Sequence, residues 1–88
     1  MTYAVAFSQR AVRDFDRLGR DIQKRILNRL DQISQTPHDP RLSLALTGHD
    51  GMRRSRVGGW RIIFTIDDPG RAIAIVTIER RGQVYKRI

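Results

Sequence analysis

The sequence predicts an α+β fold in which a pair of helices covers one face of a sheet. In the first half of the chain hydrophobic residues recur at helical spacing, and from Gly51 onward the pattern changes to the alternation typical of strands. Two turn signals, Gly58-Gly59 and the segment 67–70, divide the second half into three parts. We therefore expect an N-terminal strand, an α-helical hairpin and a three-stranded antiparallel meander, in one domain over residues 1–88.

A strand and a short helix are expected before residue 20. Tyr3, Val5 and Phe7 alternate with small or polar residues, which predicts a strand over residues 2–7. Ser8 is a suitable N-cap for the helix that follows, and Gly19 is its expected C-terminal stop. In this first helix four apolar residues recur at helical spacing: Ala11, Val12, Phe15 and Leu18.

A second helix is expected over residues 21–35, with Pro37 just beyond its end. Its buried stripe would have Leu27 at the edge and four residues along the centre: Ile22, Ile26, Leu30 and Ile33. Residues 37–50 are rich in proline, glycine and polar residues around three leucines, which predicts a loop. Because Gly58-Gly59 and residues 67–70 form tight turns, the meander should consist of strands over 52–57, 60–67 and 71–79.

The composition indicates an anionic partner. The net charge is +8, with fifteen arginines and two lysines against nine acidic residues. Residues 51–88 hold nine cations and three acids, so most of the excess lies in the second half. Arginine binds phosphate or carboxylate through two parallel hydrogen bonds, so RNA, DNA and an acidic protein all fit. The absence of cysteine excludes disulfides and thiolate zinc sites. No apolar run reaches bilayer length, so we expect a cytoplasmic protein that does not enter a membrane.

Three arginines are expected on one face of the meander. If Gly58-Gly59 is a two-residue hairpin loop, Arg56 lies opposite Arg61, and Arg54 shares their face. Like charges directly opposite each other are destabilising, which favours an external anion between them. The alternative is a solvated surface on which the side chains splay apart. Arg80, Arg81 and Tyr85 follow the last predicted strand and could extend the cationic group.

Other chemistries find little support. His38 and His49 lie in the predicted loop without a cysteine or a helical partner, so we expect no metal site. His49 and Asp50 could serve acid–base chemistry, but we expect them to be a solvated pair in the loop. No glycine-rich phosphate loop precedes a helix, no Ser-His-Asp set can be assembled, and no cofactor is expected. Trp60 is interpreted as a packing aromatic of the hairpin.

Four segments, taken in order and at their spacing, resemble the RelE/ParE superfamily of toxins from type II toxin–antitoxin systems. They are AVRDFDRL near the N-terminus, LALTG in the loop, GMRRSRVGGWRIIFTID over the hairpin and IERRGQVYKR near the C-terminus. The resemblance covers nearly the whole chain. It implies a ribosome-dependent endoribonuclease that cuts mRNA, and an antitoxin that neutralises it.

The resemblance also implies roles for six residues. Arg61 matches the arginine that holds the scissile phosphate, and Arg81 matches one implicated in leaving-group protonation or phosphate contact. Tyr85 matches the tyrosine that stacks on a base or orients the attacking 2′-hydroxyl. Arg54, Arg56 and Arg80 would bind RNA phosphates. Arg80 stands where several branches have histidine, so this chain lacks their obvious general base.

Two other functions remain open from the sequence. A ParE-like toxin would poison DNA gyrase by protein contact and cleave nothing, although such members tend to lose the arginines and tyrosine kept here. A non-catalytic nucleic-acid-binding or antitoxin-binding protein is the third. For a toxin, the expected partner is an antitoxin with an acidic, initially disordered segment that orders on binding.

Overall fold

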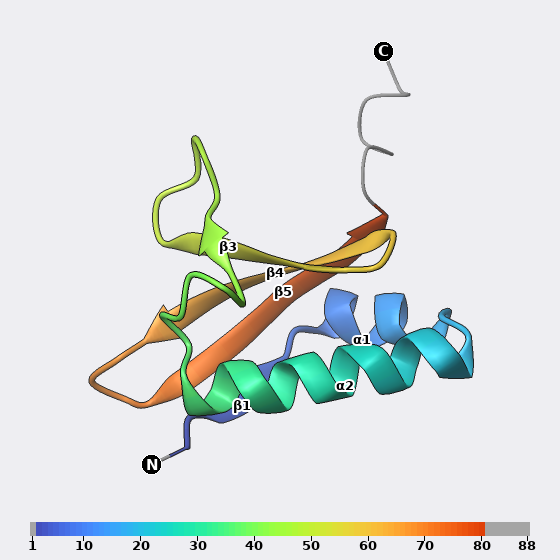
Figure 1. The fold of residues 1–88 in the computed structure, drawn as a ribbon, viewed down its shortest axis with the longest axis horizontal. Coiled ribbons are helices and arrows are strands. Elements are labelled where there is room, and N and C mark those ends of the chain that lie inside the picture. The colour runs from blue at the N-terminus through green and yellow to red at the C-terminus, as the bar shows by residue number, and fades with distance from the viewer. Residues whose placement is uncertain (1, 81–88) are drawn as a thin grey trace.

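Five strands form one mixed sheet, and two helices lie against one of its faces (Figure 1). The computed structural model describes residues 2–80 of the chain. The strands lie side by side in the order β1-β5-β4-β3-β2. In chain order the elements are β1 (Ala4–Phe7), α1 (Gln9–Asp16), α2 (Arg20–Gln35), β2 (Leu44–Ala45), β3 (Met52–Val57), β4 (Trp60–Asp67) and β5 (Ala72–Arg80). The predicted α+β class and its element order are confirmed.

The meander is antiparallel, as predicted, and a further strand joins each of its sides. On one side β1 pairs in parallel with β5, from Ala4 opposite Ala72 to Phe7 opposite Ile75. On the other side Leu44 and Ala45 pair with β3. The prediction of an unbroken loop over residues 37–50 is therefore wrong at β2. Both residues of this strand are exposed, so no alternation of buried and exposed side chains announces it.

The helix ends agree with the sequence in part. The Ser8 side chain accepts a hydrogen bond from the Ala11 N–H, so the predicted N-cap is confirmed. Gly19 was expected to end the first helix, but it has extended geometry and is the N-cap of α2. Val12, one of the apolar residues at helical spacing, is 45% exposed. α1 is short and buries a narrow stripe around Ala11, which turns Val12 toward solvent.

The core lies between α2 and the sheet. Ile26, Leu30 and Ile33 of α2 are buried as predicted, and Leu27 at the edge of the stripe is 52% exposed. They belong to one buried cluster with residues of three strands: Val57, Ile62, Phe64, Ile73, Ile75 and Ile78. Because side chains alternate along a strand, the strand residues that lie between these core residues point to the sheet face away from the helices. Over residues 2–80, neither helix is long and apolar enough to span a bilayer.

A bulge in β5 changes which residues face the helices. Ile63 pairs with Thr77 and Phe64 with Ile75, so Val76 is an extra residue in β5. Ile75 faces the core before the bulge and Ile78 after it, a spacing of three residues. α1 contacts the bulge directly. The Ser8 hydroxyl donates to the Val76 carbonyl at 2.7 Å, and the Asp14 carboxylate accepts from the Thr77 hydroxyl at 2.7 Å and the Ile78 N–H at 3.0 Å.

We expect Asp14→Ala to lower the free energy of unfolding by about 1–3 kcal/mol, because it leaves the bulge donors without their charged acceptor. Chemical denaturation at neutral pH measures this. Asp16→Ala is the matched control, because Asp16 lies on the same helix, is exposed and forms no side-chain hydrogen bond within residues 2–80. Equal stability of the two variants would contradict the role of Asp14.

Candidate nucleic-acid interface

Arg54, Arg56 and Arg61 lie on the sheet face that points away from the helices. Val57 pairs with Trp60 and Arg56 with Arg61, so the hairpin has the register that Gly58-Gly59 predicts. Ser55 and Val57, which alternate with Arg54 and Arg56 along β3, are buried toward the helices. The hydrophobic pattern that packs the core thereby places these three cations together.

Arg61 has a partner within the chain that the sequence did not reveal. Its Nε and Nη2 atoms donate to Glu79 Oε1 at 2.9 and 2.6 Å, and the two side chains are 20% and 29% exposed. Glu79 lies directly opposite Arg61 on β5. The bulge makes this possible, because without the extra residue the alternation would turn Glu79 to the helix side. The repulsion between Arg56 and Arg61 is thus relieved internally, and by itself it does not require an external anion.

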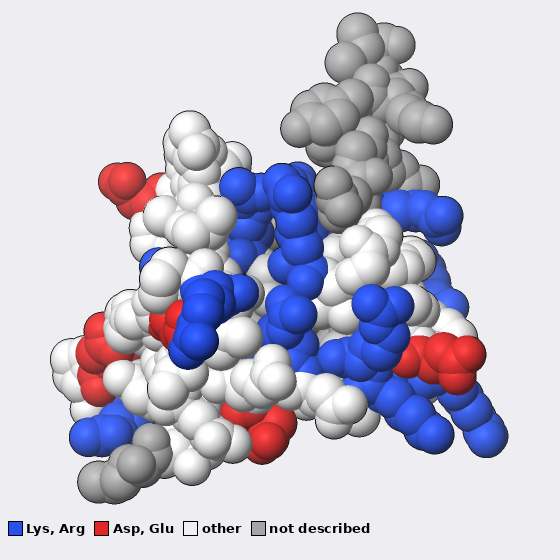
Figure 2. All heavy atoms as spheres, in the orientation of Figure 1, with Lys and Arg blue, Asp and Glu red and all other residues white. Residues whose placement is uncertain are grey.

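An arginine-lined cleft of about 280 Å³ opens beside β3. Arg54 and Arg56 line it from the strand, Arg29 from α2 and Arg41 from the loop before β2. Figure 2 shows that cationic side chains on this side of the molecule form a band between the sheet and α2. Two of the predicted phosphate-binding residues therefore share one concave, strongly basic surface.

Arg29 and Arg41 differ in their role in this cleft. Arg29 Nη1 donates to Ser55 Oγ at 2.9 Å and to the Arg56 carbonyl at 2.8 Å, which ties α2 to β3. Arg41 donates to both carboxylate oxygens of Asp39, and this hydrogen bonding holds the pKa of Asp39 below its usual value. Arg41 is therefore paired within the chain. Neither Arg54 nor Arg56 forms an ion pair with another residue of the described range 2–80.

The hairpin turn continues the basic surface. Gly58 has φ +60, a conformation that glycine adopts without strain, whereas Gly59 does not need it. A Cβ atom at Gly58 would lie 3.1 Å from Nη1 of Arg25, so this α2 guanidinium rests on the turn. Arg25 and Arg29 are four residues apart and thus extend from the same side of the helix.

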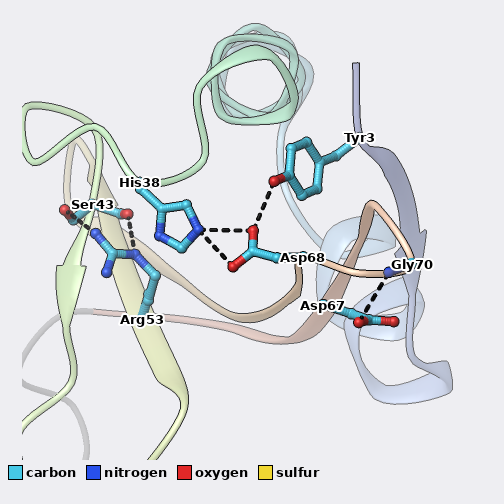
Figure 3. A network of polar contacts seen from close by, with 7 residues as sticks. All are labelled: Tyr3, His38, Ser43, Arg53, Asp67, Asp68 and Gly70. Carbon is cyan, nitrogen blue, oxygen red and sulfur yellow. Dashed lines mark hydrogen bonds and ion pairs between the residues drawn. The ribbon is translucent and has the colours of Figure 1, made fainter. Parts of the chain in front are cut away.

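The remaining predicted site residues are not gathered here. Arg80 is the last residue of β5 and pairs with Trp60, on the opposite face from Arg61 and Glu79. Its guanidinium carbon lies 5.4 Å from the centroid of the Trp60 ring. Arg81 and Tyr85 lie outside the described residues. Arg53, next to Arg54, has a structural role, because it donates to the Ser43 hydroxyl and carbonyl (Figure 3).

His38 belongs to a polar network with Asp68 and Tyr3. Its Nε2 atom lies 2.9 and 3.0 Å from the two Asp68 carboxylate oxygens, and the Tyr3 hydroxyl donates to the same carboxylate at 2.7 Å (Figure 3). The hydrogen bond from Tyr3, followed by that from His38, lowers the pKa of Asp68. The hydrogen bond between Tyr3 and Asp68 also raises the pKa of the Tyr3 hydroxyl. No cluster of three potential metal ligands occurs among residues 2–80.

Comparisons with known proteins agree on one family. The model of the ParE toxin of the type II toxin–antitoxin system parDE matches residues 5–85. A putative RelE-like toxin protein of Escherichia coli is 26% identical over 81 residues, covering 92% of this chain and 85% of that protein. The RelBE2 toxin–antitoxin complex of Mycobacterium tuberculosis contains a chain that is 25% identical with a TM-score of 0.80, covering 92% of this chain and 100% of that one. A chain of the Escherichia coli RelBE complex is 16% identical with a TM-score of 0.81, covering 92% and 99%, and supports the fold alone.

The network around Asp68 leads to a pH-dependent prediction. Because the folded pKa of Asp68 is depressed, its ionised form stabilises the fold above the unfolded value of about 3.9, and this contribution disappears as pH falls through the folded pKa. We expect Asp68→Asn to melt at a lower temperature than the wild type at pH 7, with the gap closing below about pH 4. Thermal melts across this range measure it, with Asp50→Asn, an exposed loop carboxylate, as control. A gap independent of pH would contradict the assignment.

Proposed function

The chain belongs to the ParE toxin family of type II toxin–antitoxin systems, in the RelE/ParE superfamily, and from this premise we propose that it is an endoribonuclease that cuts mRNA on the ribosome in the cytoplasm. One observation supports the nuclease most strongly. Arg54, Arg56 and Arg61 share the sheet face away from the helices, and two of them line a basic cleft. A single-stranded RNA backbone fits such a surface, because guanidinium groups bind its phosphates in bidentate fashion.

In the proposed reaction the 2′-hydroxyl of one nucleotide attacks the adjacent phosphorus. A 2′,3′-cyclic phosphate forms and the bond to the 5′-oxygen of the next nucleotide breaks. Arg61, with Arg54 and Arg56 nearby, stabilises the charge that develops on the phosphorane. Arg81 and Tyr85 keep the roles expected from the resemblance, in leaving-group contact and in orienting the hydroxyl. Arginine stays protonated at working pH, so none of the arginines can accept the hydroxyl proton.

Glu79 supplies a candidate for that missing proton acceptor. Its carboxylate is the acidic group that contacts Arg61, and one of its oxygens, Oε2, forms no hydrogen bond within residues 2–80. Bound phosphate would draw Arg61 toward itself and leave Glu79 beside the reacting hydroxyl. General-base catalysis contributes about 10²–10⁴-fold in enzymes. The proton would pass from the 2′-oxygen to Glu79, while the leaving 5′-oxygen, contacted by Arg81, takes a proton from water.

The matching family model is that of the ParE toxins, and this match favours a second function. In this alternative the chain inhibits DNA gyrase by protein–protein contact, and its basic face binds protein carboxylates. The internal pairing of Arg61 with Glu79 is compatible with it, because this pair needs no RNA to be satisfied.

The deciding experiment is translation of a defined mRNA in vitro, with primer extension to map cuts, beside a gyrase supercoiling assay. We expect cuts within the translated region only when ribosomes are present, and unchanged supercoiling. Arg61→Ala should reduce cleavage about 10²–10³-fold and Glu79→Gln about 10²-fold or more. Arg71→Gln, at the distant β4–β5 turn, should cleave normally. Intact mRNA with inhibited supercoiling would establish the alternative, and faster cleavage by Glu79→Gln would show that Glu79 masks Arg61.

The proposed partner is an antitoxin that covers the basic face with an acidic segment, folding as it binds. The similar chain of Mycobacterium tuberculosis was solved in a toxin–antitoxin complex. Co-expression with the neighbouring open reading frame should rescue growth and yield a stable complex. Rising salt should slow association, while the formed complex persists through its apolar contacts. A neighbour that neither binds nor rescues, together with harmless expression of this chain alone, would contradict the toxin assignment in the cell.

A further inference from the structure

The end of the sheet carries a second basic surface, separate from the face of Arg61. The bulge at Val76 turns Arg80 to the helix-bearing side, where it pairs with Trp60 and lies over its ring at 5.4 Å. Trp60 is only partly buried, although it touches the hydrophobic core. Trp60 therefore packs against the core and is also partly exposed beside Arg80.

Trp60 and Arg80 line a pocket of about 260 Å³, near the lower limit of ~300 Å³ for small-ligand sites. Arg10 and Arg17 of α1 line the same pocket, and Leu18 and Ile78 give it an apolar wall. The pocket thus combines an aromatic ring, an aliphatic surface and three guanidinium groups in one small volume.

The two acidic residues of this pocket are already engaged elsewhere. Asp14 accepts hydrogen bonds from Thr77 and Ile78 of the bulge, and Glu79 is bound by Arg61 on the other side of the sheet. Arg10 approaches Asp14 only to 3.9 Å and is 68% exposed. Arg17 and Arg80 form no ion pair with any residue of the described part of the chain. The pocket is therefore a concave site with an excess of uncompensated positive charge.

We propose that this pocket binds one nucleotide of a single-stranded RNA, with its base against Trp60 and its phosphates between Arg80, Arg17 and Arg10. Single-stranded nucleic acid is recognised by aromatic stacking together with cationic contacts to the backbone, and both are present here. Trp60 and Arg61 are consecutive residues facing opposite sides of the strand end. A strand whose scissile phosphate lies at Arg61 can therefore continue around the end of β4 into this pocket. The inference rests on the proposed function for the identity of the strand.

An acidic peptide is the competing occupant, and the pocket favours a nucleotide over it. A carboxylate would satisfy the arginines but would leave Leu18, Ile78 and the part of the indole that Arg80 does not cover without an apolar partner. A base covers that surface and carries its negative charge on the adjacent phosphates. The two occupants also differ in their effect on the indole, because stacking of a base quenches tryptophan fluorescence.

The test uses the single tryptophan of the chain, whose emission, excited selectively over that of the two tyrosines, reports on this pocket. The purified full-length protein is titrated with a short 2′-O-methyl oligonucleotide, which cannot be cleaved by its own 2′-oxygen. We expect saturable quenching, and a dissociation constant at least tenfold higher for Arg80→Gln. Trp60→Phe is measured with a labelled oligonucleotide by anisotropy and should bind several-fold more weakly. Circular dichroism melts identify any variant that fails to fold.

Arg71→Gln is the matched control, since Arg71 also lies over an aromatic ring, 5.8 Å from the centroid of Tyr3, but at the turn between β4 and β5. It should bind like the wild type. Oligonucleotide binding without quenching, with Arg80→Gln unaffected, would overturn the inference while leaving the nuclease intact. Equal quenching and competition by poly-glutamate would also overturn it. Quenching by the oligonucleotide without any mRNA cleavage would support nucleotide binding in this pocket and would contradict the proposed endoribonuclease activity.

Discussion

The hydrogen bonds between α1 and the bulge of β5 are the contact on which the arrangement of charges depends. Asp14 and Ser8 bind the backbone and side chains around Val76, where β5 gains one residue relative to β4. This extra residue determines which face of the sheet each later side chain of β5 points to. Glu79 comes to lie against Arg61, and Arg80 comes to lie against Trp60. The aspartate of the N-terminal motif thus binds residues 63 and 64 positions away and thereby sets the orientation of Glu79 and Arg80.

Much of the fold could be read from hydrophobic spacing, because each correctly predicted element buries a continuous pattern. The stripe of α2 and the alternation in β3 and β4 are of this kind, and their bounds agree with the structure within one residue. What failed lacked such a pattern. β2 has two exposed residues, and the position of β1 beside β5 depends on long-range pairing that no local signal encodes.

The candidate site divides in the same way. The shared face of Arg54, Arg56 and Arg61 followed from a hairpin loop and strict alternation, which are local. Glu79 as the partner of Arg61 could not be foreseen, because it depends on an insertion in β5 that is invisible in the apolar pattern. Arg29 and Arg41 join the cleft through the packing of α2 and the course of the loop. The local sequence therefore predicted a cationic face, whereas the residues that contact or surround its arginines could be identified only from the tertiary structure.

The attachment of Arg29 to the strand beside it has a consequence for self-association. An outer strand with free carbonyl groups is a template onto which another molecule can add its own strand. Along β3, the short β2 occupies the part at Arg53 and Arg54, and the guanidinium of Arg29 takes the carbonyl of Arg56 further along. A strand approaching this edge from a second copy meets a fixed positive charge in place of an open acceptor. The Arg56 carbonyl, in the part of β3 beyond β2, is therefore unavailable for pairing with a strand of a second copy.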